Sequence, residues 1–171
     1  MTMISADSLT YHPDGTSEEE RAQYGVLPWR TGRRGDLRIL LITDRDRAEW
    51  GVPKGWPVEG RVPFMSAALD AFEEAGIIGD IDSRPLTDYT HVRQHDDGTQ
   101  LACRVTLFAM RVRGTLLQWK EGSERQRRWF AADEAADRIE NVELARFVRK
   151  LASGQRALTD GAGRLAMAGH A

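Results

Sequence analysis

The chain has 171 residues, a formal net charge of −2 and 41% hydrophobic residues. This length suits one domain with a substantial core, and the near-neutral charge does not support a nucleic-acid or membrane surface. No apolar run approaches the roughly 18 residues that indicate a membrane span. A single cysteine, Cys103, rules out an internal disulfide and a cysteine-based zinc site, and the N-terminus lacks the pattern of a secretory signal. We therefore expect a cytoplasmic protein.

The chain divides into a polar start, a middle region with strand and helix patterns, and an end rich in Gly, Ala and polar residues. We expect a flexible N-terminal arm over residues 1–22, one folded domain over 23–153, and a flexible C-terminal tail over 154–171. No repeat and no linker between two domains is visible.

The domain begins with strand patterns. Residues 24–30 predict a strand that Pro28 would place at a sheet edge or a bulge, because proline cannot donate a ladder hydrogen bond. Residues 37–43 (LRILLIT) form a short apolar run that predicts a buried strand, and residues 49–52 predict a further short strand.

A helix is predicted from Pro63 to Gly76. Proline suits the first turn, where its missing N–H has no partner, and glycine suits the C-cap. Small and aromatic residues recur at helical spacing along one face, namely Phe64, Ala67, Ala68, Ala71, Phe72 and Ala75. The alanines would let the helix lie close to a sheet.

The second half of the domain alternates strands with turns and then becomes helical. The patterns predict strands over 77–81, 86–93, 101–112 and 127–130, a hairpin turn at 95–98 (HDDG), and helices over 133–139 and 142–151. This order of a mixed sheet, a central helix and a C-terminal helix fits an α/β/α sandwich.

Three carboxylates of the central helix, Asp70, Glu73 and Glu74, stand at positions i, i+3 and i+4. This spacing places them on one helix face, where like charges weaken the helix by a few tenths of a kcal/mol per pair. A hard divalent cation would compensate them. From spacing alone, a solvated helix face is the commoner explanation.

The stretch from Gly51 to Ile78, GVPKGWPVEGRVPFMSAALDAFEEAGII, resembles the signature box of the Nudix hydrolases, G-x5-E-x7-R-E-U-x-E-E-x-G-U, where U is a bulky apolar residue. The positions that match the box are Gly55, Glu73, Glu74, Gly76 and Ile77. The preceding PKGWP resembles the opening of Nudix enzymes of the diphosphoinositol-polyphosphate and dinucleotide-polyphosphate type, and it is most similar to a bacterial subgroup.

Four positions depart from the box. Arg61 stands at its first glutamate, Leu69 at its arginine, Asp70 at the first of its three metal-binding glutamates, and Ala71 at a bulky apolar position. Aspartate reaches about 1.5 Å less than glutamate, and misplacement on this scale can cost about 100-fold in rate. An arginine that holds a metal ligand is typically worth about 10- to 100-fold. Arg61 is one residue that could supply the missing positive charge.

The resemblance implies the Nudix α/β/α sandwich with a mixed sheet, and a metal-dependent pyrophosphohydrolase activity. It implies Asp70, Glu73 and Glu74 as catalytic residues that hold Mg²⁺ or Mn²⁺ together with the carbonyl of Gly55. One of these carboxylates would accept the proton of the attacking water. A further acid from the loop that holds Glu121 and Glu124 is the alternative, although a solvated position is the commoner explanation for both.

Three basic residues are candidates for substrate binding: Lys54, Arg30 and Arg104. Each could also be a surface charge. Trp29 and Trp56 could stack on a base, although packing is the commoner role. The expected partner is a small phosphorylated substrate, with no nucleic acid and no membrane, and a homodimer is compatible with the sequence.

Two functions fit these observations. The first is a pyrophosphohydrolase for a nucleoside or inositol polyphosphate, of which the PKGWP opening favours the diadenosine-polyphosphate or diphosphoinositol type. The second is a degenerate Nudix domain that binds a nucleotide or another phosphorylated ligand without efficient hydrolysis. The retained glutamate pair and glycines favour the enzyme, whereas Asp70, Leu69 and Arg61 favour the binding domain.

Overall fold

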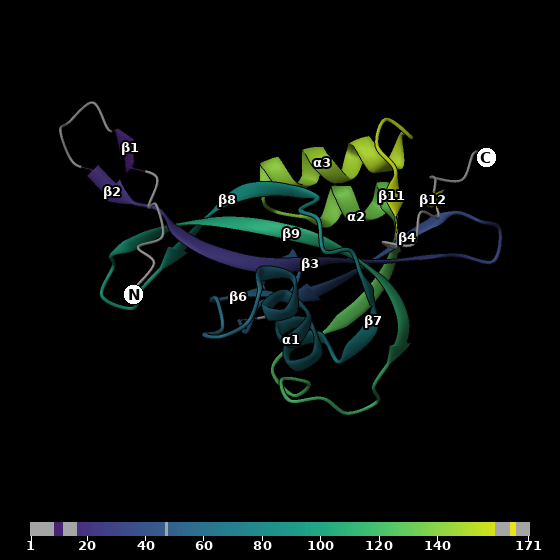
Figure 1. Cartoon of the computed structure of the whole chain (residues 1–171), viewed down its shortest axis with the longest axis horizontal. Coiled ribbons are helices and arrows are strands. Elements are labelled where there is room, and N and C mark those ends of the chain that lie inside the picture. Colours follow the sequence, from purple (N-terminus) through teal and green to yellow (C-terminus); the bar gives the residue numbers. More distant parts are fainter. Residues whose placement is uncertain (1–8, 12–16, 47, 160–164, 167–171) are drawn as a thin grey trace.

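The computed structural model describes residues 9–11, 17–46, 48–159 and 165–166. A mixed sheet of eight strands lies between two helical layers (Figure 1). Helix α1 (Pro63–Ala75) covers one face, while α2 (Ala132–Arg138) and α3 (Val142–Ala152) cover the other. The predicted α/β/α sandwich is thereby confirmed. Within the described ranges, no helix is long and apolar enough to cross a membrane.

The sheet runs in the order β10-β4-β3-β9-β7, with β5 paired to β4, β6 to β3 and β8 to β9. Strands β3 and β9 are parallel, and the other pairs are antiparallel, so the sheet is mixed. Its strands are β3 (Arg21–Thr31), β4 (Leu37–Thr43), β5 (Trp50–Gly51), β6 (Lys54–Gly55), β7 (Ile77–Ile81), β8 (Thr87–Gln94), β9 (Gln100–Thr115) and β10 (Arg127–Ala131).

Two short strand pairs lie outside this sheet, β1 (Leu9–Tyr11) with β2 (Ser17–Glu19) and β11 (Leu158–Thr159) with β12 (Leu165–Ala166). The predicted arm over 1–22 and the predicted tail over 154–171 fall partly outside the described residues. Their flexibility stays a prediction.

The strand that contains Pro28 is central, so its predicted place at an edge or a bulge is wrong. Backbone N–H groups alternate between the two sides of a strand. Val26 donates to Pro53 O (3.0 Å) on the β6 side, so the nitrogen of Pro28 faces that same side. Pairing with β6 ends at Gly25, and pairing with β4 begins at Trp29. The missing donor therefore falls where β3 changes partners.

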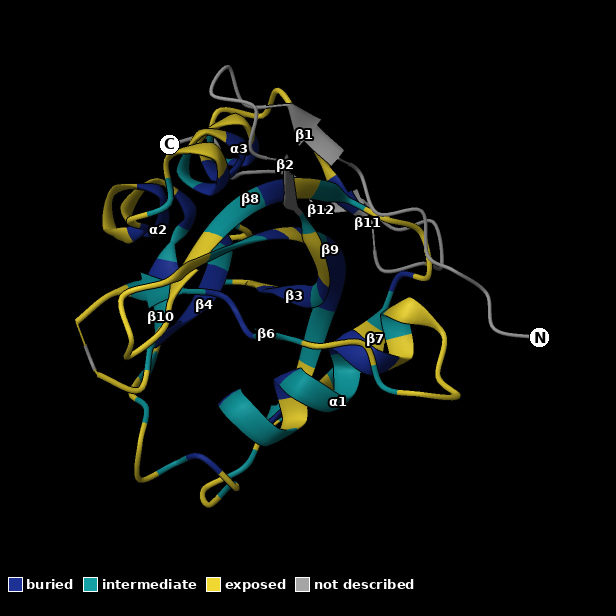
Figure 2. Ribbon diagram, turned by 90° about the vertical axis from the view of Figure 1, so that its left-hand side faces the viewer, coloured by how far each residue is buried: buried dark blue, intermediate teal, exposed yellow. Residues whose placement is uncertain are grey.

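Alternation along β3 sends buried side chains into two separate cores. Val26 packs under α1 with Ala67 and Ala71, whereas Leu27 and Trp29 pack toward α2 and α3. The three residues Ala67, Ala71 and Ala75 are fully buried, which lets α1 lie close to the sheet as predicted. Figure 2 shows the buried residues along the strands and on the inner sides of the helices, with exposed residues on the outer turns.

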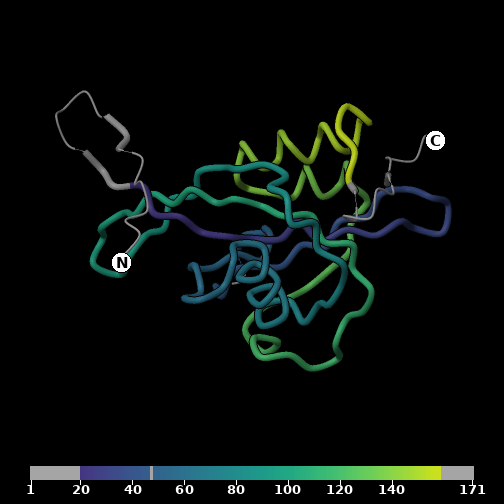
Figure 3. Tube along the Cα trace, viewed as in Figure 1, coloured from purple at the N-terminus to yellow at the C-terminus, as the bar shows by residue number. Residues whose placement is uncertain are grey.

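Helix α1 ends as predicted at Gly76, whose φ of 62° is in the left-handed region that glycine adopts without strain. A Cβ at this position would lie 2.7 Å from Cβ of Trp119, so the close approach also requires glycine. Trp119 belongs to the connection between β9 and β10, residues 116–126. Figure 3 shows this connection, in green, passing around the end of α1.

The β9–β10 connection and the start of β10 supply donors to the last carbonyls of α1, which have no partner within the helix. Glu121 N–H donates to Glu73 O, Trp119 Nε1 to Glu74 O, Arg127 Nη1 to Ala75 O and Leu116 N–H to Gly76 O, at 3.1, 2.8, 2.8 and 2.8 Å. The helix has no basic residue in its last turn. Arg127 therefore provides the positive charge that suits a helix C-terminus.

The hydrophobic core extends beyond α3, because Leu158 is fully buried in the same cluster as Leu151. We expect Leu158→Ala to lower the free energy of unfolding by about 2–5 kcal/mol, as for other buried leucines, in chemical denaturation. Leu117→Ala is the matched control because this side chain is 95% exposed. Equal stabilities of the two variants would show that residue 158 lies outside the cooperative domain.

Candidate active site

Asp70 extends from α1 toward β6 and lies directly against Gly55. A Cβ at position 55 would lie 2.5 Å from Asp70 Oδ2, so only glycine leaves room for this carboxylate. Asp70 Oδ2 is buried and has no hydrogen-bond partner among the residues that the structure describes. Burial, together with the nearby carboxylates of Glu73 and Glu121, raises the pKa of Asp70 to about 6. This position is short of positive charge.

Glu74 points toward the start of β6. Its Oε2 accepts a hydrogen bond from the backbone N–H of Lys54 (3.2 Å), and its Oε1 lies 3.7 Å from Nη2 of Arg125. The side chain is mostly buried, and burial raises the pKa of Glu74 to about 7, although Arg125 and Lys54 act in the opposite direction. Glu74 is therefore poised between a charged and a neutral form near neutral pH.

The β9–β10 connection adds a fourth acid, Glu121. Its Oε1 lies 3.1 Å from Nε of Arg125 and 3.2 Å from Nη2 of Arg45. Arg125 also donates to the carbonyl of Thr43 (3.1 Å), which fixes the guanidinium beside both Glu74 and Glu121. Of the two loop acids singled out in the sequence, the structure buries Glu121 and leaves Glu124 exposed.

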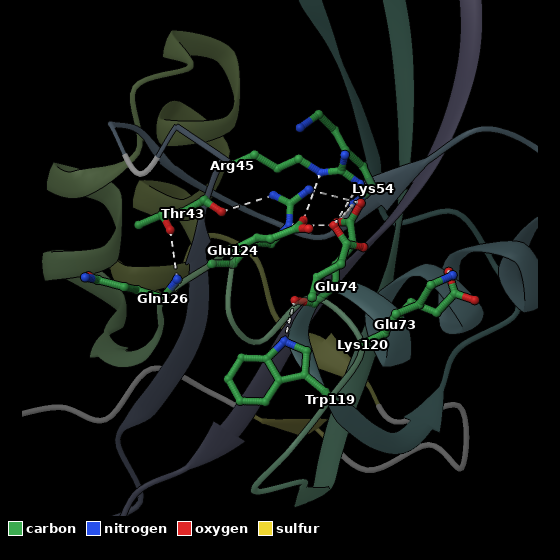
Figure 4. A network of polar contacts seen from close by, with 11 residues as sticks. Thr43, Arg45, Lys54, Glu73, Glu74, Trp119, Lys120, Glu124 and Gln126 are labelled. Carbon is green, nitrogen blue, oxygen red and sulfur yellow. Dashed lines mark hydrogen bonds and ion pairs between the residues drawn. The ribbon is translucent and has the colours of Figure 1, made fainter.

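Glu73 turns away from this group and lies beside Lys120, with 3.6 Å between Oε2 and Nζ (Figure 4). Two cations of the β9–β10 connection, Lys120 and Arg125, thus contact the paired glutamates. They stand in place of the arginine that the box has at Leu69. Arg61, considered for this role in the sequence, lies exposed in the turn before α1. In the sequence Arg125 belongs to an arginine cluster that could equally be solvated, and its place beside the acids was not predicted; its i, i+4 spacing from Glu121 was the one signal.

The three predicted substrate-binding residues separate in the structure. Lys54 lies beside Glu74, as described. Arg30 packs its guanidinium over the ring of Trp129, with Cζ 4.1 Å from the ring centroid. Arg104 forms an ion pair of 2.7 Å with Asp88 on the neighbouring strand. The structure therefore brings Lys54 to the acids and engages Arg30 and Arg104 elsewhere.

Across the described part of the chain, no three side chains of Asp, Glu, His or Cys converge closely enough to hold a metal ion. The reason is visible in the contacts: Glu74 and Glu121 turn to Arg125, and Glu73 turns to Lys120. By charge and donor type the residues fit a divalent cation. The unpartnered oxygen of Asp70 and the raised pKa values of Asp70 and Glu74 are the features that such a cation would relieve.

Known proteins were compared with the chain by sequence and by structure. No family model matches the chain. It is 28% identical over 114 residues to Nudix hydrolase 12, mitochondrial, of Arabidopsis thaliana, an alignment that covers 65% of this chain and 53% of the relative. The chain thus spans about half the length of the curated relatives that it matches.

Two solved structures have the same fold. The Ap4A hydrolase of C. elegans in a binary complex superimposes with a TM-score of 0.56 at 18% identity, covering 78% of this chain and 96% of that one. The NUDIX domain of Shewanella oneidensis NrtR, complexed with ADP ribose, gives a TM-score of 0.58 at 13% identity, covering 82% of this chain and 92% of that one. Sequence similarity and fold agree in relating the chain to the Nudix hydrolases.

Proposed function

We propose that the chain is a metal-dependent pyrophosphohydrolase acting on a nucleoside or inositol polyphosphate, with the diadenosine-polyphosphate or diphosphoinositol type favoured. The observation that carries this proposal is the half-buried carboxylate of Asp70 against Gly55, whose buried Oδ2 has no partner among the described residues, with Glu73, Glu74 and Glu121 nearby. The name of the Ap4A hydrolase among the structural neighbours supports the substrate class.

Each side chain has a role in this proposal. Asp70, Glu73, Glu74 and the carbonyl of Gly55 would hold Mg²⁺ or Mn²⁺. When bound, such a cation neutralises phosphoryl charge and lowers the pKa of a water ligand. Lys54 would contact a phosphate. Catalysis of phosphoryl transfer depends mainly on this positioning and charge neutralisation.

The proton of the attacking water goes to a carboxylate of the same group. Glu121 is the further acid expected from a later loop, and Arg45 and Arg125 hold its carboxylate in place. We assign the role of proton acceptor to Glu121 or to one of the helix carboxylates.

A domain that binds a phosphorylated ligand without efficient hydrolysis is the second candidate. Two observations favour it: Glu74 and Glu121 are engaged by Arg125, and Asp70 is shorter than the glutamate of the box. The NUDIX domain of NrtR, which was solved with ADP ribose, is a neighbour of this fold. The cytoplasmic location and the homodimer stay predictions from the sequence.

Turnover of a substrate panel separates the two candidates. We expect release of phosphate or mononucleotide from at least one dinucleoside polyphosphate, nucleoside diphosphate derivative or diphosphoinositol polyphosphate with Mg²⁺ or Mn²⁺, and loss of that activity in EDTA. The measurement is product formation by ion-exchange chromatography. Stabilisation of the protein by these compounds with no turnover of any of them would favour the binding domain.

Neutralising one box glutamate tests the metal-binding face. We expect Glu73→Gln to lower kcat by about 100-fold or more, because it removes a charged ligand while keeping the side-chain shape. Glu134→Gln is the matched control, since Glu134 is an exposed residue of α2 paired only with Arg138 (3.9 Å) among the described residues. Steady-state kinetics with unchanged melting temperatures would make the comparison valid, and equal kcat values would refute the assignment.

The raised pKa values predict how the metal-free protein responds to pH. The folded state favours the protonated forms of Asp70 and Glu74, so each group stabilises the folded protein at about pH 4. This stabilisation is lost as the pH rises through about 6 for Asp70 and about 7 for Glu74. In EDTA, the free energy of unfolding should therefore fall across this range. This decrease in the free energy of unfolding should be smaller in Asp70→Asn than in the wild type. In the exposed control Asp46→Asn it should equal that of the wild type. A slope that Asp70→Asn leaves intact would contradict the burial of this charge.

A further inference from the structure

We propose that a second group of side chains, on the opposite face of β6 from Asp70, binds the phosphates of a multiply phosphorylated anion. This group, the cationic face, consists of Arg21, Gln23, Lys54, Trp56, His91 and Arg93. Its place as a subsite for the substrate's remote phosphates rests on the proposed function, whereas the binding of the anion itself does not.

Strand register brings four of these residues to one face of the sheet. Arg21 on β3 is the partner of Cys103 on β9, and Cys103 is the partner of His91 on β8. Side chains of directly paired residues stand on the same face. Gln23 and Arg93 are each two residues further along their strands and return to that face.

Lys54 reaches the same face because its partner on β3 is a glycine. A Cβ at Gly25 would lie 3.0 Å from Cβ of Lys54 and 2.9 Å from Cδ2 of Leu107. Leu107 belongs to the core on the α3 side of the sheet. Gly25 therefore leaves the space that the lysine side chain occupies on this side.

Trp56 is two residues beyond Lys54 and sits between two arginines. The guanidinium carbons of Arg21 and Arg93 lie 5.6 and 5.9 Å from the centroid of its ring. These distances are at the outer limit for a cation–π contact, so the arginines are near the ring but not fully stacked on it. The ring is 38% exposed, which leaves surface for a ligand.

The two arginines of this face have no ion-pair partner among the side chains that the structure describes. No carboxylate among the side chains with described placement lies within 4.0 Å of Arg21, Arg93 or Nζ of Lys54, whereas Arg104 and Arg113 on β9 each pair with an aspartate. Lys54 interacts with Glu74 at longer range. Burial lowers the pKa of Lys54, and burial, Lys54 and Arg93 lower the pKa of His91 to about 4. Positive charges thus crowd one another here, although the whole chain has a net charge of −2.

Gln23 provides an independent observation. It is 4% exposed, and its Oε1 is buried without a hydrogen-bond partner among the residues placed by the structure. An unpaired buried amide oxygen is unfavourable. A ligand that donates a hydrogen bond, such as a ribose, inositol or amino group, would supply the missing partner.

The two groups meet at Lys54. Its backbone N–H donates to Glu74 on the acidic side, while its side chain lies on the cationic face. A chain of phosphates could therefore extend from the acids to the arginines. We infer that the acids face the bond to be cleaved and that the cationic face holds the phosphates further along.

Calorimetric titration with inorganic tripolyphosphate in EDTA tests this site without metal or turnover. We expect binding by the wild-type protein and about tenfold weaker binding by Arg21→Gln and by Arg93→Gln, from the loss of a charge-assisted contact. Arg113→Gln, at the other end of β9 and paired with Asp80, should bind like the wild type. No binding by the wild type, or equal affinity of all four proteins, would overturn the proposal.

A second variant separates a binding role of Gln23 from a structural one. Gln23→Met keeps the side-chain length and removes the unpaired oxygen, so its melting temperature should rise while its affinity for ATP in EDTA falls. A rise in melting temperature with unchanged affinity would overturn the role of Gln23.

The same titrations identify the source of the phosphates. If the ligand is a nucleotide, Trp56→Leu should weaken the binding of ATP and leave the affinity for tripolyphosphate unchanged. This result would support the site. If it is an inositol polyphosphate, inositol hexakisphosphate should bind more tightly than ATP in both proteins, which also supports it. If tripolyphosphate, ATP and inositol hexakisphosphate all fail to bind, the proposal is overturned.

Failure of this site can be told apart from failure of the proposed function. Glu73→Gln should lose turnover and keep its affinity for tripolyphosphate. Arginine-dependent binding without any turnover would leave the site standing and remove the hydrolase. Metal-dependent turnover with KM unchanged in Arg21→Gln and Arg93→Gln would keep the hydrolase and remove the site.

Discussion

The contact between the end of α1 and the β9–β10 connection is the constraint on which the site depends. A helix end leaves carbonyls without partners, and here those of residues 73 to 76 are satisfied by donors from residues 116–127. The same connection carries Lys120, Glu121 and Arg125 to the helix. One structural requirement therefore also fixes which charges surround Glu73 and Glu74.

Charge balance around the helix follows from this arrangement. In the family box an arginine on the helix itself is implied, and Leu69 cannot replace it. Arg125 is instead held by the carbonyl of Thr43 and reaches both Glu74 and Glu121. Asp70 receives no such cationic partner from the described residues, and its pKa is raised by burial and by the neighbouring carboxylates. A cation-binding role is the physical reason we offer for a half-buried carboxylate with one buried oxygen left in this state.

The short strand β6 separates two chemical environments within two residues. Gly55 faces α1, where its missing side chain admits Asp70, and Lys54 faces the other side, where the missing side chain of Gly25 admits the lysine. Because successive residues of a strand point to opposite faces, adjacent positions can serve an acidic and a cationic surface. The two glycines are both required by close approach rather than by a turn.

Local patterns in the sequence determined the elements: the helix from Pro63 to the Gly76 cap, the buried strand over 37–43 and the hairpin turn at 95–98 all appear in the structure. The carboxylates at positions 70, 73 and 74 were visible for the same reason, since helical spacing is local. Only the tertiary structure decided that Pro28 lies in a central strand and that Arg125, rather than Arg61, meets Glu74. Those facts depend on which distant segments pair, and the strand order and the path of a connection are not encoded in the spacing of neighbouring residues.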